Sequence, residues 1–310
     1  MAKVSIAIPT YNRPEFLAEA IRSILVQTFQ DFEIVIFDDL SDYNIADFLS
    51  QFPAKPIKFL RSEVRLGSNR KNFERISCYQ FSSDYVLIFH DDDTMRRNFL
   101  EASVKLLDVN PEMAFTASSL TFVANSKLMG DINPIRKVNP IILPDAAAFS
   151  RTLLGGYDLC FDSVLYRTSV LENYDPYYER YGKWADRPYL LSLAKKGSVG
   201  IFKEKFINYR LHGSQDSQKS AELDFEHSTK QLYLSHKDAL PQPLSPADQK
   251  LFLKFSTNNI LLTYGKASEN LKQYFGYVKS FKRQGFFSWS ALSVKGLVYL
   301  LKSFFSLVFR

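Results

Sequence analysis

A chain of 310 residues, 46% of them hydrophobic, is long enough for one large α/β domain or for one domain with a smaller appendage. The formal charge of +6 is uneven, because residues 250–310 contain ten Lys or Arg and one Asp or Glu. A basic block of this kind favours an anionic partner, and we expect a membrane surface and no nucleic acid.

The two cysteines and the N-terminus indicate the compartment. Cys78 and Cys160 lie outside any metal-binding spacing, so free thiols and a reducing compartment are expected. The first residues lack the long apolar core of a signal peptide and begin as a strand. We therefore expect a cytoplasmic protein.

Short apolar runs and amphipathic segments alternate along the chain. Strands are expected at 4–8, 33–37, 57–60, 86–89, 115–123, 161–166 and 206–209. Helices are expected from Glu15, over 68–80, 97–109, 145–154 and 186–196, and from about Ala221 to Arg310. Loops are expected at the turn from Pro9 to Pro14, over 130–144 and over the aromatic segment 174–181.

This alternation predicts an α/β fold with a mostly parallel sheet, helices on both faces and right-handed crossovers. The turn after the first strand contains neither G-x-G-x-x-G nor a P-loop sequence, so dinucleotide-binding and P-loop functions lose their main support.

The stretch around residue 90 carries the strongest functional signal. The apolar run 86–89 is typical of a strand buried on both faces. His90 and the adjacent carboxylates Asp91, Asp92 and Asp93 follow it. These charges repel one another, and bound Mg²⁺ or Mn²⁺ would relieve the repulsion at the strand end where open α/β sheets bind ligands. An acidic loop that caps the next helix is the alternative reading.

Five short segments occur in a characteristic order. They are Ser5-Ile-Ala-Ile-Pro-Thr-Tyr-Asn-Arg13, Ile34-Val-Ile-Phe-Asp-Asp39, Phe89-His-Asp-Asp-Asp93, Ala185-Asp186 and Tyr209-Arg-Leu-His-Gly-Ser-Gln-Asp-Ser217. Together they resemble the family 2 inverting glycosyltransferases of the GT-A fold. The resemblance implies a Rossmann-like, nucleotide-sugar-binding catalytic domain over 1–217 and a helical C-terminal extension over 218–310. It also implies transfer of a sugar from a nucleotide-diphosphate-sugar to an acceptor hydroxyl with inversion.

The resemblance implies roles for the matching residues. The nucleotide would be bordered by Pro9, Thr10, Tyr11, Arg13, Asp39 and Asp91. The cofactor Mn²⁺ or Mg²⁺ would be held by Asp92, Asp93 and His212. The diphosphate would be bound by Arg210 and His212. Asp186 would be the catalytic base, which removes the acceptor proton.

Several of these residues have plainer explanations. Asp186 precedes Arg187-Pro188 and could cap a helix, Asp39 could be an ordinary loop acid, and His212 could be a surface histidine. Two positions depart from the family pattern. Leu40 stands where Gly is common, so we expect a different loop shape there, and His90 stands where many members have Asp, which leaves its role open.

Other functions remain as alternatives. A haloacid dehalogenase-type phosphatase also places D-x-D after a buried strand, but Met95 occupies the position where that pattern requires Thr or Val. A nucleotidyltransferase would share nucleotide and metal binding. A non-enzymatic binding module is the third alternative. It has little support, because it gives no shared role to the acidic residues, Asp186 and the Arg210/His212 segment.

The terminal segment 290–310 is amphipathic. Its polar stripe is Lys295, Tyr299, Lys302, Ser303, Ser306 and Arg310, and Leu, Val and Phe fill most of the rest. Two internal lysines favour a helix lying in a membrane interface over one that spans it; a core-packing helix is the alternative. The resemblance also implies a donor that carries UDP or dTDP and a glycan or lipid-linked acceptor, since many relatives build bacterial surface polysaccharides. We therefore expect a peripheral protein on the inner face of the cell membrane.

Overall fold

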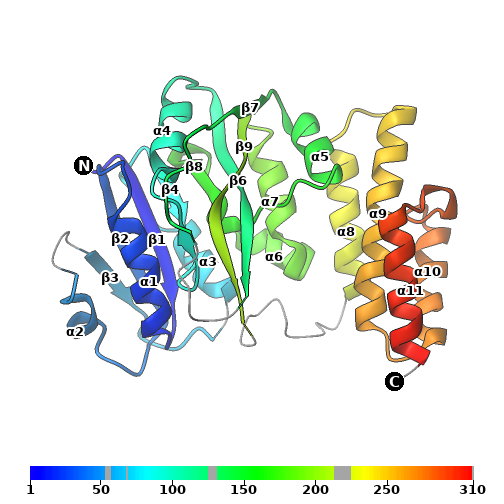
Figure 1. The fold of residues 1–310 in the computed structure, drawn as a ribbon, viewed down its shortest axis with the longest axis horizontal. Helices are drawn as coiled ribbons and strands as arrows, with labels where there is room; N and C mark the ends of the chain where they lie inside the picture. The colour runs from blue at the N-terminus through cyan, green and yellow to red at the C-terminus, as the bar shows by residue number, and fades with distance from the viewer. Residues whose placement is uncertain (53–56, 68, 125–130, 213–224, 309–310) are drawn as a thin grey trace. The chain divides into compact units, whose positions relative to one another are not determined.

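Figure 1 shows the chain in a computed structural model that describes residues 1–52, 57–67, 69–124, 131–212 and 225–308. The chain forms two compact units. The sheet unit comprises Met1–Asp145, Asp158–Glu179 and Ser192–Gln218. The helical unit comprises Ala146–Tyr157, Arg180–Leu191 and Lys219–Arg310, so two segments that precede residue 218 group with the C-terminal helices.

One half of the sheet is parallel. β1 (Val4–Thr10) lies between β2 (Phe32–Asp38) and β4 (Tyr85–Ile88), and β3 (Ile57–Arg61) pairs with β2 at the edge. All four residues of β4 are buried, as the continuous apolar run predicted. β1 runs two residues further than expected, so Pro9 and Thr10 belong to the strand and not to the following turn.

The other half is mixed. β8 (Val164–Arg167) pairs antiparallel with β4 and with β6 (Met113–Ala124). β9 (Ser198–Leu211) runs parallel to β6 and antiparallel to the short strands β5 (Thr94–Met95) and β7 (Pro140–Leu143). The predicted parallel pairing therefore holds for the first four strands, and beyond β4 the only parallel pair among the described residues is β6 with β9.

Two sequence expectations in this half were wrong. The segment 130–144, expected as a loop, contains β7, whose Pro140 stands at the first strand position, where the missing N–H is tolerated. The strand expected at 206–209 extends over all of β9, because the charged residues at 203–205 interrupt its apolar pattern without ending its pairing.

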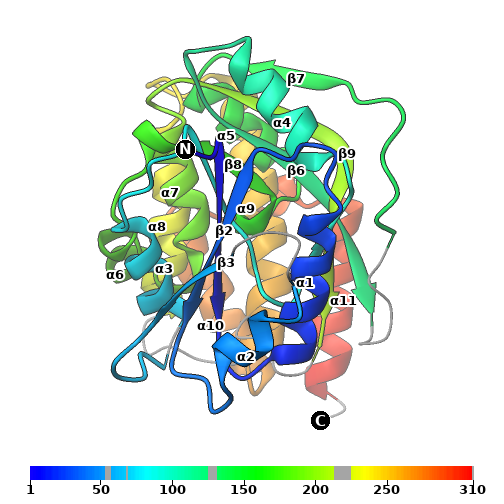
Figure 2. The ribbon, with the colours of Figure 1, turned by 90° about the vertical axis from the view of Figure 1, so that its left-hand side faces the viewer.

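Helices cover both faces of the parallel half. Figure 2 shows α1 (Pro14–Leu25) and α3 (Asn69–Ser77) on opposite sides of β1–β3. α1 begins with proline at its first position, a residue pre-organised for that place. Its buried residues pack with those of α4 (Phe99–Asp108) in the core cluster that contains the inward side chains of β1, β2 and β4. α2 (Ile45–Leu49) is a short helix between β2 and β3.

The aromatic segment expected as a loop is helix α6 (Asp175–Tyr181). Its Asp-Pro start is a helix-initiation signal that the aromatic residues obscured. Tyr174 and Tyr181 at its two ends are buried. The expected free thiols are confirmed, since neither Cys78 nor Cys160 forms a disulfide.

The helical unit has a core of its own. Its helices are α5 (Ala146–Leu154), most of α7 (Asp186–Leu193), α8 (Phe225–Asp238), α9 (Pro246–Ala267), α10 (Leu271–Arg283) and α11 (Val294–Val308). The core is rich in aromatic rings, and Tyr233 contacts Phe252, Phe281 and Phe286 at centroid distances of 5.5 to 6.3 Å. Packing of this kind accounts for part of the large number of Phe and Tyr residues in the chain.

Candidate active site

The carboxyl ends of β1, β2 and β4 lie at one edge of the sheet, because these strands are parallel neighbours. The residues that follow them are therefore brought together. The Thr10 hydroxyl donates a 2.8 Å hydrogen bond to Asp91 Oδ2, and the Asp39 N–H donates to the Thr10 carbonyl at 3.0 Å. The acidic residues that follow β2 and β4 are thus joined through Thr10, at the end of β1.

Asp91 and Asp92 share one cation. Arg13 Nη1 lies 3.3 Å from Asp91 Oδ1 and 3.1 Å from Asp92 Oδ2, and His212 Nε2 lies 2.8 Å from the same Asp92 oxygen. Burial raises the pKa of Asp91 to about 7, and the adjacent Asp92 adds to this shift. Additional positive charge at this place would therefore favour the ionised pair.

Asp92 and His212 fit a divalent ion. Their two facing donor atoms are a carboxylate oxygen and an imidazole nitrogen, and both side chains retain about a tenth of their exposure. Carboxylates and water suit Mg²⁺ and Mn²⁺ alike, whereas imidazole suits the transition metals better, so this pair favours Mn²⁺.

Arg210 ties the acidic residues to the rest of the sheet unit. Its backbone N–H donates to Asp93 Oδ1 at 2.7 Å, and its Nε donates to the carbonyl of Asp92 at 2.7 Å. Its guanidinium pairs with Glu19 and lies over the Phe16 ring, 4.7 Å from the ring centre. This buried side chain positions the acidic loop; its predicted contact with a diphosphate stays a prediction.

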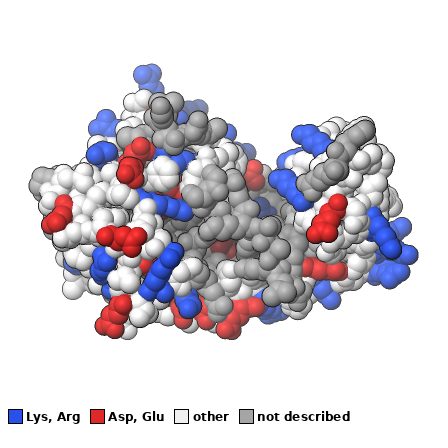
Figure 3. All heavy atoms as spheres, turned by 90° about the horizontal axis from the view of Figure 1, so that it is seen from below, with Lys and Arg blue, Asp and Glu red and all other residues white. Residues whose placement is uncertain are grey.

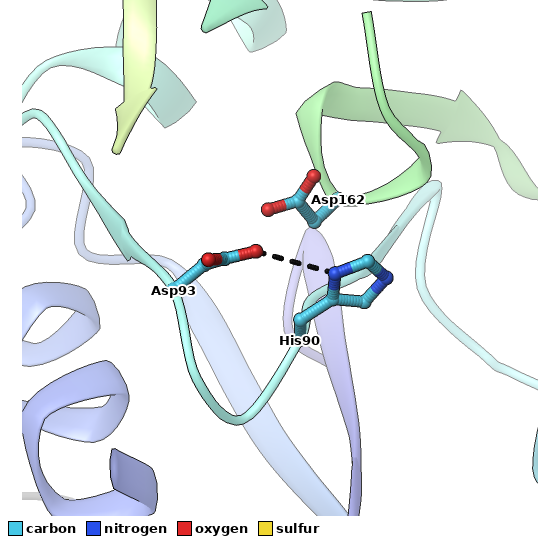
Figure 4. Close-up of side chains that lie close together, drawn as sticks. All are labelled: His90, Asp93 and Asp162. Atoms are coloured by element: carbon cyan, nitrogen blue, oxygen red, sulfur yellow. Dashed lines mark hydrogen bonds and ion pairs between the residues drawn. The ribbon is translucent and has the colours of Figure 1, made fainter. Parts of the chain in front are cut away.

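His90 belongs to a second cluster, shown in Figure 4. His90 Nδ1 lies 3.2 Å from Asp93 Oδ2, and Asp162 faces both. One donor atom from each residue lies within 4.8 Å of the other two, so the three could also hold a metal ion. Burial alone would lower the pKa of His90, but Asp162, Asp93 and Asp92 raise it to about 10. Burial and the facing Asp93 raise the pKa of Asp162 well above its usual value.

Asp162 is a site residue that sequence reasoning missed. It lies in a short 3-10 turn, Phe161–Ser163, just before β8 and is fully buried. Its Oδ1 accepts from the Cys160 thiol, and its Oδ2 has no hydrogen-bond partner among the described residues. No motif or strand-end position marks it, so only the tertiary fold reveals its relation to His90.

Asp39 is held by the loop that follows β3. Its two carboxylate oxygens accept from the N–H groups of Leu66 at 2.6 Å and Gly67 at 3.0 Å. Gly67 has φ of +71°, which glycine adopts without strain. Leu40 has φ of +63°, so leucine here adopts the left-handed conformation for which glycine is usually required.

Tyr11 lies at the edge of this group. The Arg65 guanidinium sits over its ring, 4.0 Å from the ring centre. The next residue, Asn12, has φ of +50° and donates its N–H to the Ser41 hydroxyl at 3.0 Å. The turn after β1 is thereby fixed to the loop after β2, and Arg65 is a further residue that the sequence did not mark.

Asp186 is the first residue of α7 in the helical unit, and its side chain is exposed. A carboxylate in the first turn of a helix stabilises the helix dipole whether or not it has another role. Its assignment as the catalytic base stays a prediction. The segment 213–217, which completes the last of the five segments, lies outside the described residues.

Comparison with protein families completes the assignment. The profile described as "Glycosyl transferase family 2" matches residues 5–175, which is more than half of the chain. The chain belongs to glycosyl transferase family 2. The resemblance inferred from the five segments is confirmed at the level of the family, and the matched residues include the acidic stretch at 91–93.

Two curated relatives of this family 2 chain are distant from it in sequence. An uncharacterized glycosyltransferase of Nostoc sp. is 25% identical over 232 residues, covering 74% of this chain and 70% of its own length. The Escherichia coli UDP-Glc:alpha-D-GlcNAc-diphosphoundecaprenol beta-1,3-glucosyltransferase WfgD is 26% identical over 226 residues, covering 71% of this chain and 82% of its own length.

Solved structures confirm the expected GT-A-like fold. Staphylococcus aureus TarS 1–349 in complex with UDP-GlcNAc matches with a TM-score of 0.63 at 15% identity, covering 97% of this chain and 89% of TarS 1–349. The mannosyltransferase PcManGT from Pyrobaculum calidifontis, in complex with GDP-Man and Mn²⁺, matches with a TM-score of 0.50 at 14% identity. The match covers 100% of this chain and 81% of the PcManGT chain. At these identities the likeness concerns the fold alone.

Proposed function

We propose that this glycosyltransferase is a metal-dependent, inverting enzyme that moves a sugar from a nucleotide-diphosphate-sugar to a hydroxyl of a lipid-linked glycan. One observation carries the proposal. In a family 2 chain, the carboxylates Asp39 and Asp91, which we assign to the nucleotide, lie at the same sheet edge as the Asp92–His212 pair, which has the donors for a divalent ion.

The donor nucleotide is assigned to the edge formed by β1, β2 and β4. Asp39 would accept a further hydrogen bond from the base while keeping its contacts with the N–H groups of Leu66 and Gly67, because each carboxylate oxygen has a second lone pair. Asp91, oriented by Thr10, would contact the ribose. Pro9, Tyr11 and Arg13 would border the nucleotide. TarS was solved with UDP-GlcNAc and WfgD uses UDP-Glc, which supports UDP as the nucleotide, with dTDP as the alternative.

Charge on the leaving group is the main obstacle to transfer. Mn²⁺ or Mg²⁺ held by Asp92 and His212 would stabilise the diphosphate as the glycosidic bond breaks. The Asp93 oxygens contact the Arg210 N–H and His90, so Asp93, predicted as a third ligand, would instead orient the acidic loop. Arg13 is paired with Asp91 and Asp92 and would balance the remaining carboxylate charge. The Mn²⁺ in PcManGT supports this choice of ion.

Inversion requires the acceptor oxygen to approach from the face opposite the leaving group. A carboxylate on that face would take the acceptor proton during attack, and Asp186 is the residue proposed for this step.

The proposed acceptor is lipid-linked, as the name of WfgD states for that relative. We place the enzyme on the inner face of the cell membrane as a peripheral protein, attached through its basic C-terminal region. Among the described residues, no helix has the length and apolar character needed to cross a bilayer.

A donor screen tests the proposal. Nucleotide-sugars are incubated with Mn²⁺ or Mg²⁺ and a diphosphoundecaprenol-linked sugar, and released nucleotide and extended acceptor are measured together. The proposal predicts release of a nucleoside diphosphate with one donor base. Release of pyrophosphate would indicate a nucleotidyltransferase, and full activity in excess EDTA would exclude the metal.

Asp92→Asn provides the first site-directed prediction. Removing one carboxylate charge from the proposed metal site should lower transfer by roughly a hundredfold or more and weaken Mn²⁺-dependent nucleotide binding. The matched control is Asp31→Asn, an exposed carboxylate just before the opposite end of β2, which should retain full activity. Equal activity of the two variants would contradict the metal assignment.

A further inference from the structure

Helix α11 buries two small residues and one leucine, and it exposes most of its large apolar residues. Its buried residues are Gly296, Ser303 and Leu307. Its large apolar residues with 41 to 83% exposure are Val294, Leu297, Val298, Leu301, Phe304, Phe305 and Val308, called here the α11 apolar face. A surface helix of a water-soluble protein normally does the reverse.

Close packing on α9 explains this orientation. A Cβ atom on Gly265 of α9 would lie 1.7 Å from the Ser303 hydroxyl oxygen, and one on Gly296 would lie 2.2 Å from Asn258 Oδ1. The two helices therefore approach through small residues. Ser303, which the sequence analysis assigned to an exposed polar stripe, lies at this contact instead, because only a small residue fits opposite Gly265.

The start of α11 is fixed as well. The Ser293 hydroxyl donates to Asn258 Oδ1 at 2.9 Å and accepts from the Gly296 N–H at 3.0 Å, so it caps α11 and joins it to α9. With both its start and its small face attached, α11 presents a preformed surface rather than a segment that must fold when it binds.

The α11 apolar face is continuous. At 3.6 residues per turn its seven side chains fall within a stripe of about 120°. Lys302 and Lys295 follow along one edge of that stripe, and both are exposed. The sequence contains no Asp or Glu from residue 270 to its last residue. On the side of the helical unit seen in Figure 3, several Lys and Arg side chains are visible, with a few Asp and Glu side chains among them.

We propose that the α11 apolar face binds an anionic lipid bilayer, with the helix lying in the plane of the interface. The Leu, Val and Phe side chains enter the boundary between headgroups and acyl chains, and the two lysines reach lipid phosphates at its edge. The two lysines would be repelled by the lysines of a second copy of the same face, whereas anionic lipid would attract them.

This proposal adds the attachment surface to the proposed function and is tested without any sugar transfer. Full-length protein is mixed with vesicles of phosphatidylcholine and phosphatidylglycerol, and the bound fraction is measured by flotation. The wild type should bind at low salt and lose binding as salt rises. The double variant Leu301→Gln/Phe305→Gln should lower the partition coefficient by roughly tenfold or more, since Gln keeps helix propensity and removes apolar area.

Two further variants sharpen the test. Val109→Gln changes a valine of 70% exposure after α4, in the sheet unit, and should leave vesicle binding unchanged. Lys295→Gln/Lys302→Gln should remove most of the preference for phosphatidylglycerol over pure phosphatidylcholine vesicles. The melting temperature and the circular dichroism spectrum of each variant verify that the fold is intact.

Three results would overturn the proposal. The first is a wild type that does not float with anionic vesicles at low salt. The second is a double variant that binds as well as Val109→Gln. The third is a concentration-dependent dimer, seen by sedimentation, that the double variant abolishes while vesicles bind neither protein, since the face would then be covered by a second copy. A failed transfer assay leaves all three readouts intact, so the two proposals fail separately.

Discussion

At the scale of single residues, Asp91 combines burial with a close negative neighbour. Its pKa rises to about 7, mainly through burial and then through Asp92, while Arg13 and Thr10 partly oppose the shift. The ionised side chain is thus less favourable in the folded chain than in the unfolded one, where the pKa is near 4. The stability that protonated Asp91 contributes is complete below about pH 4 and is lost as the pH rises through about 7.

Asp91→Asn should therefore stabilise the metal-free protein more at high pH than at low pH. We expect a gain of roughly 1 kcal/mol or more at pH 8 and little gain at pH 4. The measurement is denaturant unfolding in EDTA at both pH values. A gain of the same size at both would show that Asp91 does not titrate in this range.

Asp186→Asn tests the assignment of the base. Asn keeps the size of the side chain, so donor binding should persist while transfer falls by roughly a hundredfold or more. Donor affinity by calorimetry and transfer by product analysis separate the two effects. Retention of activity within a few-fold would leave Asp186 as a first-turn residue of α7 and assign the base elsewhere.

The sequence identified those site residues whose position follows from strand ends. Asp39 and Asp91 come just after β2 and β4, so an apolar run followed by acid was enough to locate them at strand ends; their roles at the nucleotide stay predictions. Asp162, Glu19 and Arg65 carried no such signal. The Arg210–Glu19 pair joins residues far apart in the chain, and a contact of that kind depends on the completed fold.

At the scale of elements, the packing of α11 on α9 gives a direct prediction. Gly265→Leu should separate the two helices, because even a Cβ atom at residue 265 meets Ser303. Overpacking of this kind costs roughly 1–3 kcal/mol, so thermal unfolding of the variant should occur several degrees lower.

The matched control is Gly276→Ala in α10. A Cβ atom there meets no heavy atom within 4 Å, and the glycine lies inside a helix. This variant should be neutral or more stable by up to about 1 kcal/mol. A Gly265→Leu variant that unfolds at the same temperature as Gly276→Ala would contradict the close α9–α11 contact.

Elements were predicted where one physical signal was dominant. β1 and β2 are mostly apolar, β4 is a continuous apolar run, and α1 has proline at its start and apolar residues at helical spacing. β7 was missed because its first residue is proline, which usually indicates a loop. Most of β9 was missed because pairing with β6 continues through a charged stretch. Neither outcome is encoded in local periodicity, since each depends on the partner strand.

At the scale of the whole molecule, the two units have separate hydrophobic cores. The core of the helical unit includes Phe286 and Phe287, which precede α11. A chain shortened to end at Gln284 would lose both rings together with α11 and would damage this core. Substitutions on the α11 apolar face are for that reason a cleaner test of membrane binding than truncation.

The two proposed ligands should protect different parts of the chain from hydrogen exchange. UDP with Mn²⁺ should slow amide exchange over residues 9–13 and 38–42 and over the 63–67 loop, where Asp39 holds the backbone N–H groups of Leu66 and Gly67. Peptides from α11 should be unchanged. Anionic vesicles should slow exchange in α11 and leave the 63–67 loop as it was, because each ligand stabilises only the region that it contacts.

Three controls define the outcome. EDTA and Asp92→Asn should each reduce the protection given by UDP, and Leu301→Gln/Phe305→Gln should remove the protection given by vesicles. Protection of α11 by UDP alone would contradict the separation of the two sites. Vesicle protection of the 63–67 loop, with none in α11, would assign the lipid contact to the sheet unit. Protection in the expected regions would link the acidic sheet edge to the nucleotide and α11 to the bilayer through independent measurements on one intact chain.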